Sequence, residues 1–327
     1  MNPRRSGFIA VAAVLSLLLI TPAFTPAAAQ DFPQREIRMI VPLPPGGAID
    51  IMARTLQAVL DDMGVRVVVD NRAGGGTATG LIDVAQAQPD GYTVGVATTA
   101  ILSLMALGQV PLEPDSFTNI TRLSEDPQLL LVRPDAPWDN VEEFMEALAA
   151  DPDSIAIGHP LINNPMHAMA ALTGRAVDVE ARNVPFDGGA PVAAALLGGH
   201  IDAGVFLSGL ALTYVEPGEL RALAVYENER LEALPDVPTF AEAGYDAFGG
   251  LGGPVAQASF IVTPAGLDPE LLDALVDIFQ EAVLSDRFQS FAADSGFRAD
   301  GLSAEELDEY LGSLFDRLGA VMPTLVE

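Results

Sequence analysis

The chain has 327 residues, of which 50% are apolar and 19% are charged, so its composition excludes a disordered polypeptide. Its 45 acidic residues outnumber 16 basic ones, and the formal net charge of −29 argues against nucleic acid or an anionic membrane surface as a partner. Every basic residue is arginine, which excludes pyridoxal enzymes, class I aldolases and P-loop ATPases, because each needs a lysine. The absence of cysteine excludes disulfides, thiol nucleophiles and thiolate metal sites.

The first 29 residues have the pattern of a secretory signal peptide. Arg4 and Arg5 form a positive start, residues 9–20 are apolar apart from Ser16, and small residues precede a cleavage point near Ala29. An uncleaved membrane anchor is the alternative, but a twelve-residue apolar stretch is short for a bilayer span. The arginine pair also leaves twin-arginine export open beside ordinary secretion. We therefore expect residues 1–29 to be removed and the mature protein to be periplasmic.

In chain order, short β-branched runs alternate with helical stripes, which predicts an α/β protein with largely parallel sheets. The first strand–loop–helix unit comprises a strand at 37–41, a proline–glycine turn and a helix with apolar spacing from 49 to 63. Further strands are expected at 65–69, 93–97, 128–132, 155–158, 177–184, 203–207 and 220–225. Further helices are expected at 141–150, 166–172 and 189–197. Two C-terminal helices are expected after an N-cap at Asp268 and a capping box at Ser303.

The junction after the first strand is the strongest local motif. Its sequence, Pro44-Pro45-Gly46-Gly47, predicts a tight turn that exposes backbone N–H groups at the start of a helix, where an anion can bind. Asp50 in the first helical turn could cap the helix or hold a water beside a ligand. A purely structural turn with a capping aspartate is the alternative.

Catalytic and metal motifs are weak by comparison. The glycines Gly74, Gly76 and Gly80 imitate a dinucleotide fingerprint, but they follow the second predicted strand and their spacing is off by one, so a second backbone-amide cradle or a plain turn fits better. The spacing of His159 and His167 does not match a helical metal pair, and no nucleophile elbow is present. We therefore expect no enzyme activity, no metal and no cofactor.

Several ordered motifs resemble the substrate-binding proteins of tripartite tricarboxylate transporters, the Bug or TctC family. In the first half these are Pro42 to Asp50 with Ala53-Arg54, Asn71-Arg72 with the glycines after it, and Pro89-Asp90-Gly91-Tyr92-Thr93. In the second half they are Val184-Pro185-Phe186 with Gly188, Gly189 and Pro191, Leu197 to Asp202, Leu220 to Val225, and Leu234 to Thr239 with Ala241 to Gly244. The resemblance spans essentially the whole mature chain.

The resemblance implies a two-lobed periplasmic-binding-protein fold of type II, with a ligand cleft between the lobes. Lobe 1 would comprise residues 30–125 plus 250–327, and lobe 2 residues 126–249. The ligand would be a small organic carboxylate held by backbone groups and ordered waters. Carried over by position, the ligand-binding residues would be Pro44, Pro45, Gly46, Gly47, Ala48, Asp50, Gly75, Thr98, Thr99, Asn163, Asn164, His167, Phe186, Asp187 and Gly188. Leu43 and Ile49 depart from the family pattern and would make one pocket wall more aliphatic.

Charge gives a physical reason for such a cleft. A strongly acidic protein without lysine repels an anion at long range, so a carboxylate must be captured by local amide dipoles in a closed site of low dielectric. The implied function is a monomeric binding protein that closes on a carboxylate and delivers it to a membrane permease of the tripartite tricarboxylate transporter type. The alternative is a carboxylate-sensing receptor subunit that signals to a membrane kinase.

Overall fold

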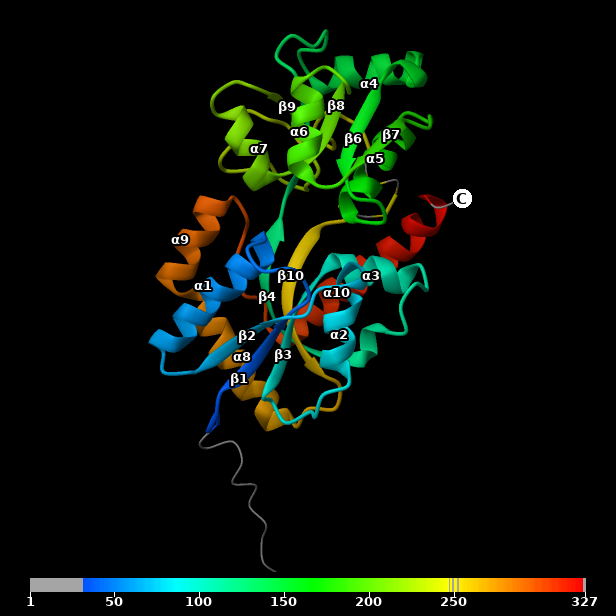
Figure 1. Ribbon diagram of the computed structural model, residues 1–327. Helices are drawn as coiled ribbons and strands as arrows, with labels where there is room; N and C mark the ends of the chain where they lie inside the picture. The colour runs from blue at the N-terminus through cyan, green and yellow to red at the C-terminus, as the bar shows by residue number, and fades with distance from the viewer. Residues whose placement is uncertain (1–31, 247, 249, 252, 326–327) are drawn as a thin grey trace, which may run out of the picture.

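A computed structural model of the protein describes residues 32–246, 248, 250–251 and 253–325. The predicted signal peptide therefore lies outside the described residues. Two five-stranded sheets dominate the structure, one in each of two lobes, as the sequence predicts (Figure 1). None of the helices in the described ranges combines the length and the apolar character that crossing a membrane requires.

The first sheet has the strand order β2-β1-β3-β10-β4. Its strands are β1 (Ile37–Val41), β2 (Val67–Asn71), β3 (Thr93–Thr98), β4 (Phe117–Asp126) and β10 (Gln257–Pro264). Strands β2, β1 and β3 are parallel, whereas β10 is antiparallel to both of its neighbours. The sheet is thus parallel apart from the one strand that returns from the second lobe.

The second sheet repeats this arrangement in the order β7-β6-β8-β5-β9. Its strands are β5 (Gln128–Val132), β6 (Ala156–Pro160), β7 (Arg182–Phe186), β8 (Ala203–Leu207) and β9 (Arg221–Val225). Here β5, the first strand after the chain leaves the first sheet, takes the antiparallel place that β10 takes in the other lobe. The two sheets therefore share the same topology. In each sheet the antiparallel strand is the first strand after the chain has crossed from the other lobe.

Helices cover both faces of each sheet (Figure 1). On the first sheet, α1 (Ala48–Asp62), α8 (Pro269–Leu284) and α9 (Asp286–Ser295) pack on one face, and α2 (Ala78–Ala85), α3 (Thr99–Ala106) and α10 (Ala304–Val321) on the other. On the second sheet, α4 (Val141–Ala150) and α5 (Pro165–Arg175) share one core, and α6 (Gly189–Leu197) and α7 (Ser208–Val215) another. Short 3-10 turns lie at Gly75–Thr77, Pro114–Ser116, Pro152–Ser154 and Met322–Leu325.

The structure corrects several predicted elements. The second strand lies two residues later than predicted, and β7 begins at Arg182 because the residues before it belong to the turn that follows α5. Strands β4 and β10 were not predicted, although they pair with each other over the whole length of β10. The capping box at Ser303 and the N-cap at Asp268 are confirmed. The lobe boundaries stay a prediction; Gly249, at one of them, lies outside the described residues.

An ionic cluster joins the end of β4 to the residues just beyond β9, near the place where the chain crosses between the lobes. Arg298 exchanges backbone hydrogen bonds with Glu125 at the end of β4, and its guanidinium contacts Glu125 and, at 3.3 Å, Glu227, which lies just beyond β9. Arg122 and the Tyr310 hydroxyl also contact Glu125, at 3.3 and 2.9 Å. Burial and the nearby Glu125 raise the pKa of Glu227 to about 7, against the opposing effect of Arg298. The cluster therefore contains a carboxyl that titrates near neutrality.

We expect Arg298→Met to destabilise the protein more at pH 8 than at pH 5. Because the pKa of Glu227 is raised from 4.5 in the folded state, its stabilising contribution is present below pH 4.5 and is lost as the pH rises through 7. Removal of the arginine leaves two buried carboxylates less compensated, at a cost of about 2 kcal/mol at pH 8. Urea unfolding at both pH values checks this. Arg317→Met, whose arginine donates to the carbonyls of Ser313 and Pro254, is the control; equal losses at the two pH values would contradict the assignment.

Candidate functional site

A cavity of about 450 Å³ lies between the two sheets, and we call it the main cavity. From the first lobe it is lined by residues that follow β1, β2 and β3, and from the second lobe by the loop after β6 and the end of β8. Its lining residues are Leu43, Ala48, Ile49, Gly76, Thr77, Thr98, Ala100, Leu104, Leu161, Ile162, Asn163, Asn164, Met166, Leu207 and Gln257. The carboxyl ends of parallel strands are where open α/β sheets bind ligands.

A second cavity of about 330 Å³, the side cavity, adjoins the first. The two share Ala48, Ile49, Leu207 and Gln257, so they form neighbouring parts of one interlobe cleft. The side cavity is further lined by Ile51, Met52, Asp126, Gly209, Leu210, Phe291, Ser295 and Phe297. On this side the Ser208 hydroxyl of α7 donates to the carbonyl of Gly296 beyond α9, so the lobes are in direct contact.

The helices that begin at the cleft differ from the others in how their N-termini are satisfied. Side chains cap α4, α8, α9 and α10, through Asn140, Asp268, Ser285 and Ser303. Helices α1, α2, α3 and α7, whose first residues or N-caps line the cleft, have no side-chain cap. No side chain therefore competes with an anion at these positive dipole ends, although the backbone already engages two of the first-turn amides: Thr79 of α2 donates to Gly74, and Ser208 of α7 donates to Pro127. Two helices break this pattern: α5 begins at the cleft and is capped by Asn164, and α6, whose N-cap Gly188 lines neither cavity, has no side-chain cap.

No arginine or histidine is among the described residues that line either cavity. Polar groups are supplied mainly by neutral side chains, and one of them lacks a partner. Thr77 is 5% exposed, its Oγ1 has no hydrogen bond within the described residues, and its φ is +89°. A buried unpaired hydroxyl and a strained backbone each cost free energy, which makes Thr77 a candidate contact for a bound molecule.

The loop between β6 and α5 is the second strained segment of the cleft. Leu161 and Asn163 have φ values of +57° and +58°, which are unfavourable for a non-glycine residue and most of all for leucine. The side chains of Leu161 and Ile162 are 54% and 62% exposed and line the main cavity. The loop thus presents apolar surface to the cleft that an occupant or closure of the lobes could bury.

Two stacked histidines hold this loop from behind. The rings of His159 and His167 lie 4.4 Å apart, centroid to centroid. His159 Nδ1 lies 2.9 Å from the carbonyl oxygen of Leu161, and the amide of Asn163 donates to His167 Nδ1 at 3.4 Å. Since a carbonyl can only accept, His159 must carry its proton on Nδ1. Burial, with the neighbouring His167, lowers the pKa of His159 to about 4, and burial also lowers the pKa of His167.

Four of the residues predicted from the family resemblance line the main cavity: Ala48, Thr98, Asn163 and Asn164. His167 lies behind the cleft loop instead, and lines a separate cavity with Arg175. Phe186 packs against the core beneath α6. The others, Pro44, Pro45, Gly46, Gly47, Gly75, Asp187 and Gly188, do not line either cavity in this structure.

Asp50 and Thr99 are engaged in structural hydrogen bonds. Asp50 accepts from the Gly46 amide, Arg54 and the Asn71 side chain, at 2.8 to 2.9 Å, and these bonds, led by that of Arg54, lower its pKa to about 2. It fastens the proline–glycine loop to α1. The Thr99 hydroxyl accepts from the amide of Ala258 at 2.9 Å and joins α3 to β10. Both residues therefore shape the cleft from behind its surface.

Sequence reasoning missed Thr77, Leu161, Ile162, Gln257 and Asp126. Gln257 and Asp126 stand opposite each other at the first residue of β10 and the last of β4. Their place at the cleft follows from pairing across more than 100 residues, which no local pattern reveals. The apolar pair Leu161-Ile162 between two prolines was the one local signal available.

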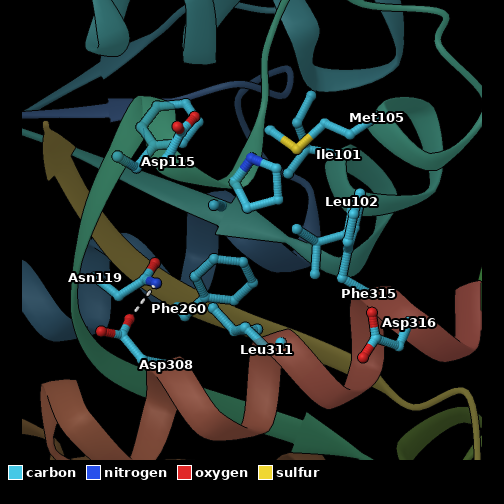
Figure 2. Close-up of a pocket in the computed structure, with 14 residues that line it drawn as sticks. Ile101, Leu102, Met105, Asp115, Asn119, Phe260, Asp308, Leu311, Phe315 and Asp316 are labelled. Atoms are coloured by element: carbon cyan, nitrogen blue, oxygen red, sulfur yellow. Dashed lines mark hydrogen bonds between the residues drawn. The ribbon is translucent and has the colours of Figure 1, made fainter. Parts of the chain in front are cut away.

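Another cavity, of about 380 Å³, lies between α3 and α10 (Figure 2). Ile101, Leu102 and Phe260 lie in its apolar lining, and Asp308, which accepts from Asn119 at 2.7 Å, lies at one side. All its walls belong to the first sheet and its helices, so movement of one lobe against the other would not close it. Within the described ranges, no three His, Asp or Glu residues gather as a metal site would require. The interlobe cleft is therefore the candidate site.

We expect acid to loosen the cleft loop through the histidine pair. A folded-state pKa below the ordinary 6.5 means that the stabilising contribution of His159 is present above pH 6.5 and is lost as the pH falls through 4. Urea unfolding from pH 7 to 4.5 should therefore show a steeper loss for the parent than for His159→Gln. His200→Gln, which changes an exposed histidine, serves as the control. Identical pH dependence in the parent and both variants would contradict this role.

Comparison with known proteins places the chain in a family. The sequence model of the tripartite tricarboxylate transporter family receptor, TctC, matches residues 52–325. Protein BugT of Bordetella pertussis is 31% identical over 300 residues, which cover 88% of this chain and 87% of the relative.

Solved structures agree in fold. A TctC solute-binding protein from Polaromonas, solved with no ligand, is 27% identical and superimposes with a TM-score of 0.79 over 90% of this chain and 99% of that one. MatC from Rhodopseudomonas palustris, solved with bound malate, is 26% identical with a TM-score of 0.72 over 89% and 100%. The Polaromonas relative is a solute-binding protein and the matched family is one of transporter receptors, which supports the expectation that the chain is a binding protein and not an enzyme. The chain belongs to the TctC family of tripartite tricarboxylate transporter receptors, and it has their two-lobed periplasmic-binding-protein fold.

Proposed function

We propose that the protein captures a small organic carboxylate by closure of its two lobes and delivers it to a membrane permease of the tripartite tricarboxylate transporter type. Secretion with cleavage near Ala29 would place this activity in the periplasm, as the N-terminal sequence indicates. Both the family and the malate bound by MatC support a carboxylate ligand.

The observation that carries the proposal is the contrast between capped and uncapped helices. Four helices present uncapped N-termini to the cleft, while side chains cap four of the helices that begin elsewhere. Since no cationic side chain lines the cavities among the described residues, these amides are the groups suited to hold a negative charge.

Closure has a ready driving force in the exposed apolar side chains of the cleft. Ile51, Leu161 and Ile162 are 48% to 62% exposed and all line one of the two cavities. Burial of one such side chain contributes about 1 to 2 kcal/mol. Ligand binding to the closed state would then shift the equilibrium between open and closed lobes toward closure.

Calorimetric titration of the dialysed protein tests the proposal. We expect binding of one or more members of a panel of four- to seven-carbon carboxylates, and no binding of the corresponding methyl esters, because an ester lacks the negative charge that the helix N-termini hold. Ile162→Ser should weaken binding about tenfold, or ~1.4 kcal/mol, while Leu284→Ser, at an equally exposed leucine on α8, should leave it unchanged.

Native mass spectrometry of the freshly purified protein identifies a retained ligand independently. A bound molecule without a carboxylate, or esters that bind as tightly as their acids, would overturn the proposal.

Thr77→Val is expected to separate ligand contact from stability. Loss of a buried, unpaired hydroxyl should leave the free energy of unfolding unchanged or raise it by up to about 1 kcal/mol, while carboxylate affinity falls about tenfold. Ser259→Ala removes another buried unpaired hydroxyl, on β10 and outside both cavities, and should alter stability alone. Urea unfolding and calorimetry on both variants check this; unchanged affinity in Thr77→Val would show that its hydroxyl makes no ligand contact.

A further inference from the structure

The side cavity contains one carboxylate, that of Asp126, and its surroundings are unusual for an acid. Asp126 is the last residue of β4 and stands opposite Gln257 in the antiparallel pair with β10. Both residues line the side cavity, and Gln257 also lines the main cavity. The carboxylate therefore lies at the cleft, next to a side chain that both cavities share.

Among the described residues that line the two cavities, Asp126 is the sole ionisable one. Its Oδ2 accepts a hydrogen bond from the Ser124 hydroxyl at 2.9 Å, and no basic side chain in the described ranges lies within ion-pair distance of it. Burial, with a smaller contribution from the like charge of the nearby Glu125, raises the pKa of Asp126 to about 6. At neutral pH the site is thus a partly buried anion with spare acceptor capacity.

The cleft is consequently polarised. Around the main cavity the uncapped N-termini of α1, α2 and α3 offer hydrogen-bond donors, and α1 reaches both cavities through Ala48. The side cavity also receives the uncapped N-termini of α1 and α7, through Ala48 and Gly209, but its one charged group can only accept while it is ionised. The remainder of its lining is apolar apart from Ser295 and Gln257. A ligand that matches this pattern carries a negative charge on one group and a donor on another.

Resting on the proposed function, we propose that the ligand bears a hydrogen-bond donor, a hydroxyl or an ammonium group, in addition to its carboxylate, and that Asp126 accepts the hydrogen bond from that donor. A second ligand carboxylate near Asp126 would be repelled in a cleft of low dielectric, so a dianion whose second carboxylate lies there binds poorly at neutral pH. Asp126 then acts as the specificity-determining residue, whereas the helix N-termini hold the carboxylate common to all ligands.

Chain-matched six-carbon probes test this by calorimetry at pH 7.5. They are hexanoate, its 2- and 6-hydroxy derivatives, its 2- and 6-amino derivatives, and the dicarboxylate adipate. In the parent protein at least one donor-bearing acid should bind ten times or more tightly than hexanoate, and adipate should bind most weakly. The hydroxy and amino arms distinguish the two kinds of donor, and the 2- and 6-positions locate it along the chain.

Asp126→Asn should abolish the advantage of an amino acid over hexanoate, reduce that of a hydroxy acid, and improve adipate binding. Asp126→Ala should abolish both advantages. Hexanoate should bind both variants at least as tightly as it binds the parent, because removal of the Asp126 charge lessens repulsion in the cleft, and this binding shows that the fold and the carboxylate site are intact. Asp316→Asn removes one negative charge at the cavity between α3 and α10 and should change nothing, which controls for net charge.

The outcomes separate this inference from the proposed function. If hexanoate binds but its substituents make no difference, or if adipate binds most tightly in the parent, the role of Asp126 is wrong while carboxylate capture stands. The role of Asp126 is also wrong if hydroxy or amino acids still bind Asp126→Ala more tightly than hexanoate does. If no carboxylate binds, the proposed function fails and this inference fails with it.

Discussion

The carboxyl ends of the parallel strands in both sheets face one gap, and this constraint determines where the site lies and what chemistry it has. Strands β1 and β3 in one lobe and β6 and β8 in the other end at the cleft. A helix that follows such a strand begins at the same edge, so its free N–H groups point to the gap. The identical strand order of the two sheets makes this true from both sides. The fold therefore supplies anion-binding groups without any basic side chain.

That arrangement reconciles the acidic composition with an anionic ligand. The long-range field of a chain with net charge −29 is screened within about 10 Å in salt, whereas aligned peptide dipoles act at contact distance. Charged side chains are instead used structurally, as in the bonds of Asp50 to Arg54 and of Glu125 to Arg298. The absence of lysine therefore leaves the protein without flexible cationic side chains, but the proposed anion-binding groups of the cleft are backbone amides and do not depend on them.

Local sequence patterns were sufficient to predict those strands and helices whose formation depends on residues close in the sequence. The strand at β5, the helix at α4 and the capping box at Ser303 all follow from short-range periodicity or hydrogen bonding. Strand β4 was missed because it contains polar residues, among them Thr121 and Arg122, that are buried and bonded to partners far away in the sequence. For the same reason four of the residues expected from the resemblance line the main cavity, while Asp50 and Thr99 are held by bonds that only the folded chain can form.

The cleft concentrates features that weaken a folded protein, and their location has a common cause. Thr77, Leu161 and Asn163 have positive φ, Thr77 has an unpaired hydroxyl, and Leu161 and Ile162 expose apolar surface. Each costs free energy that a molecule covering the cleft can compensate. Under the proposed closure, the same groups would therefore favour the closed state over the open one. The histidine pair contacts Leu161 and Asn163 from behind the loop, and these contacts help to hold the loop in its strained conformation.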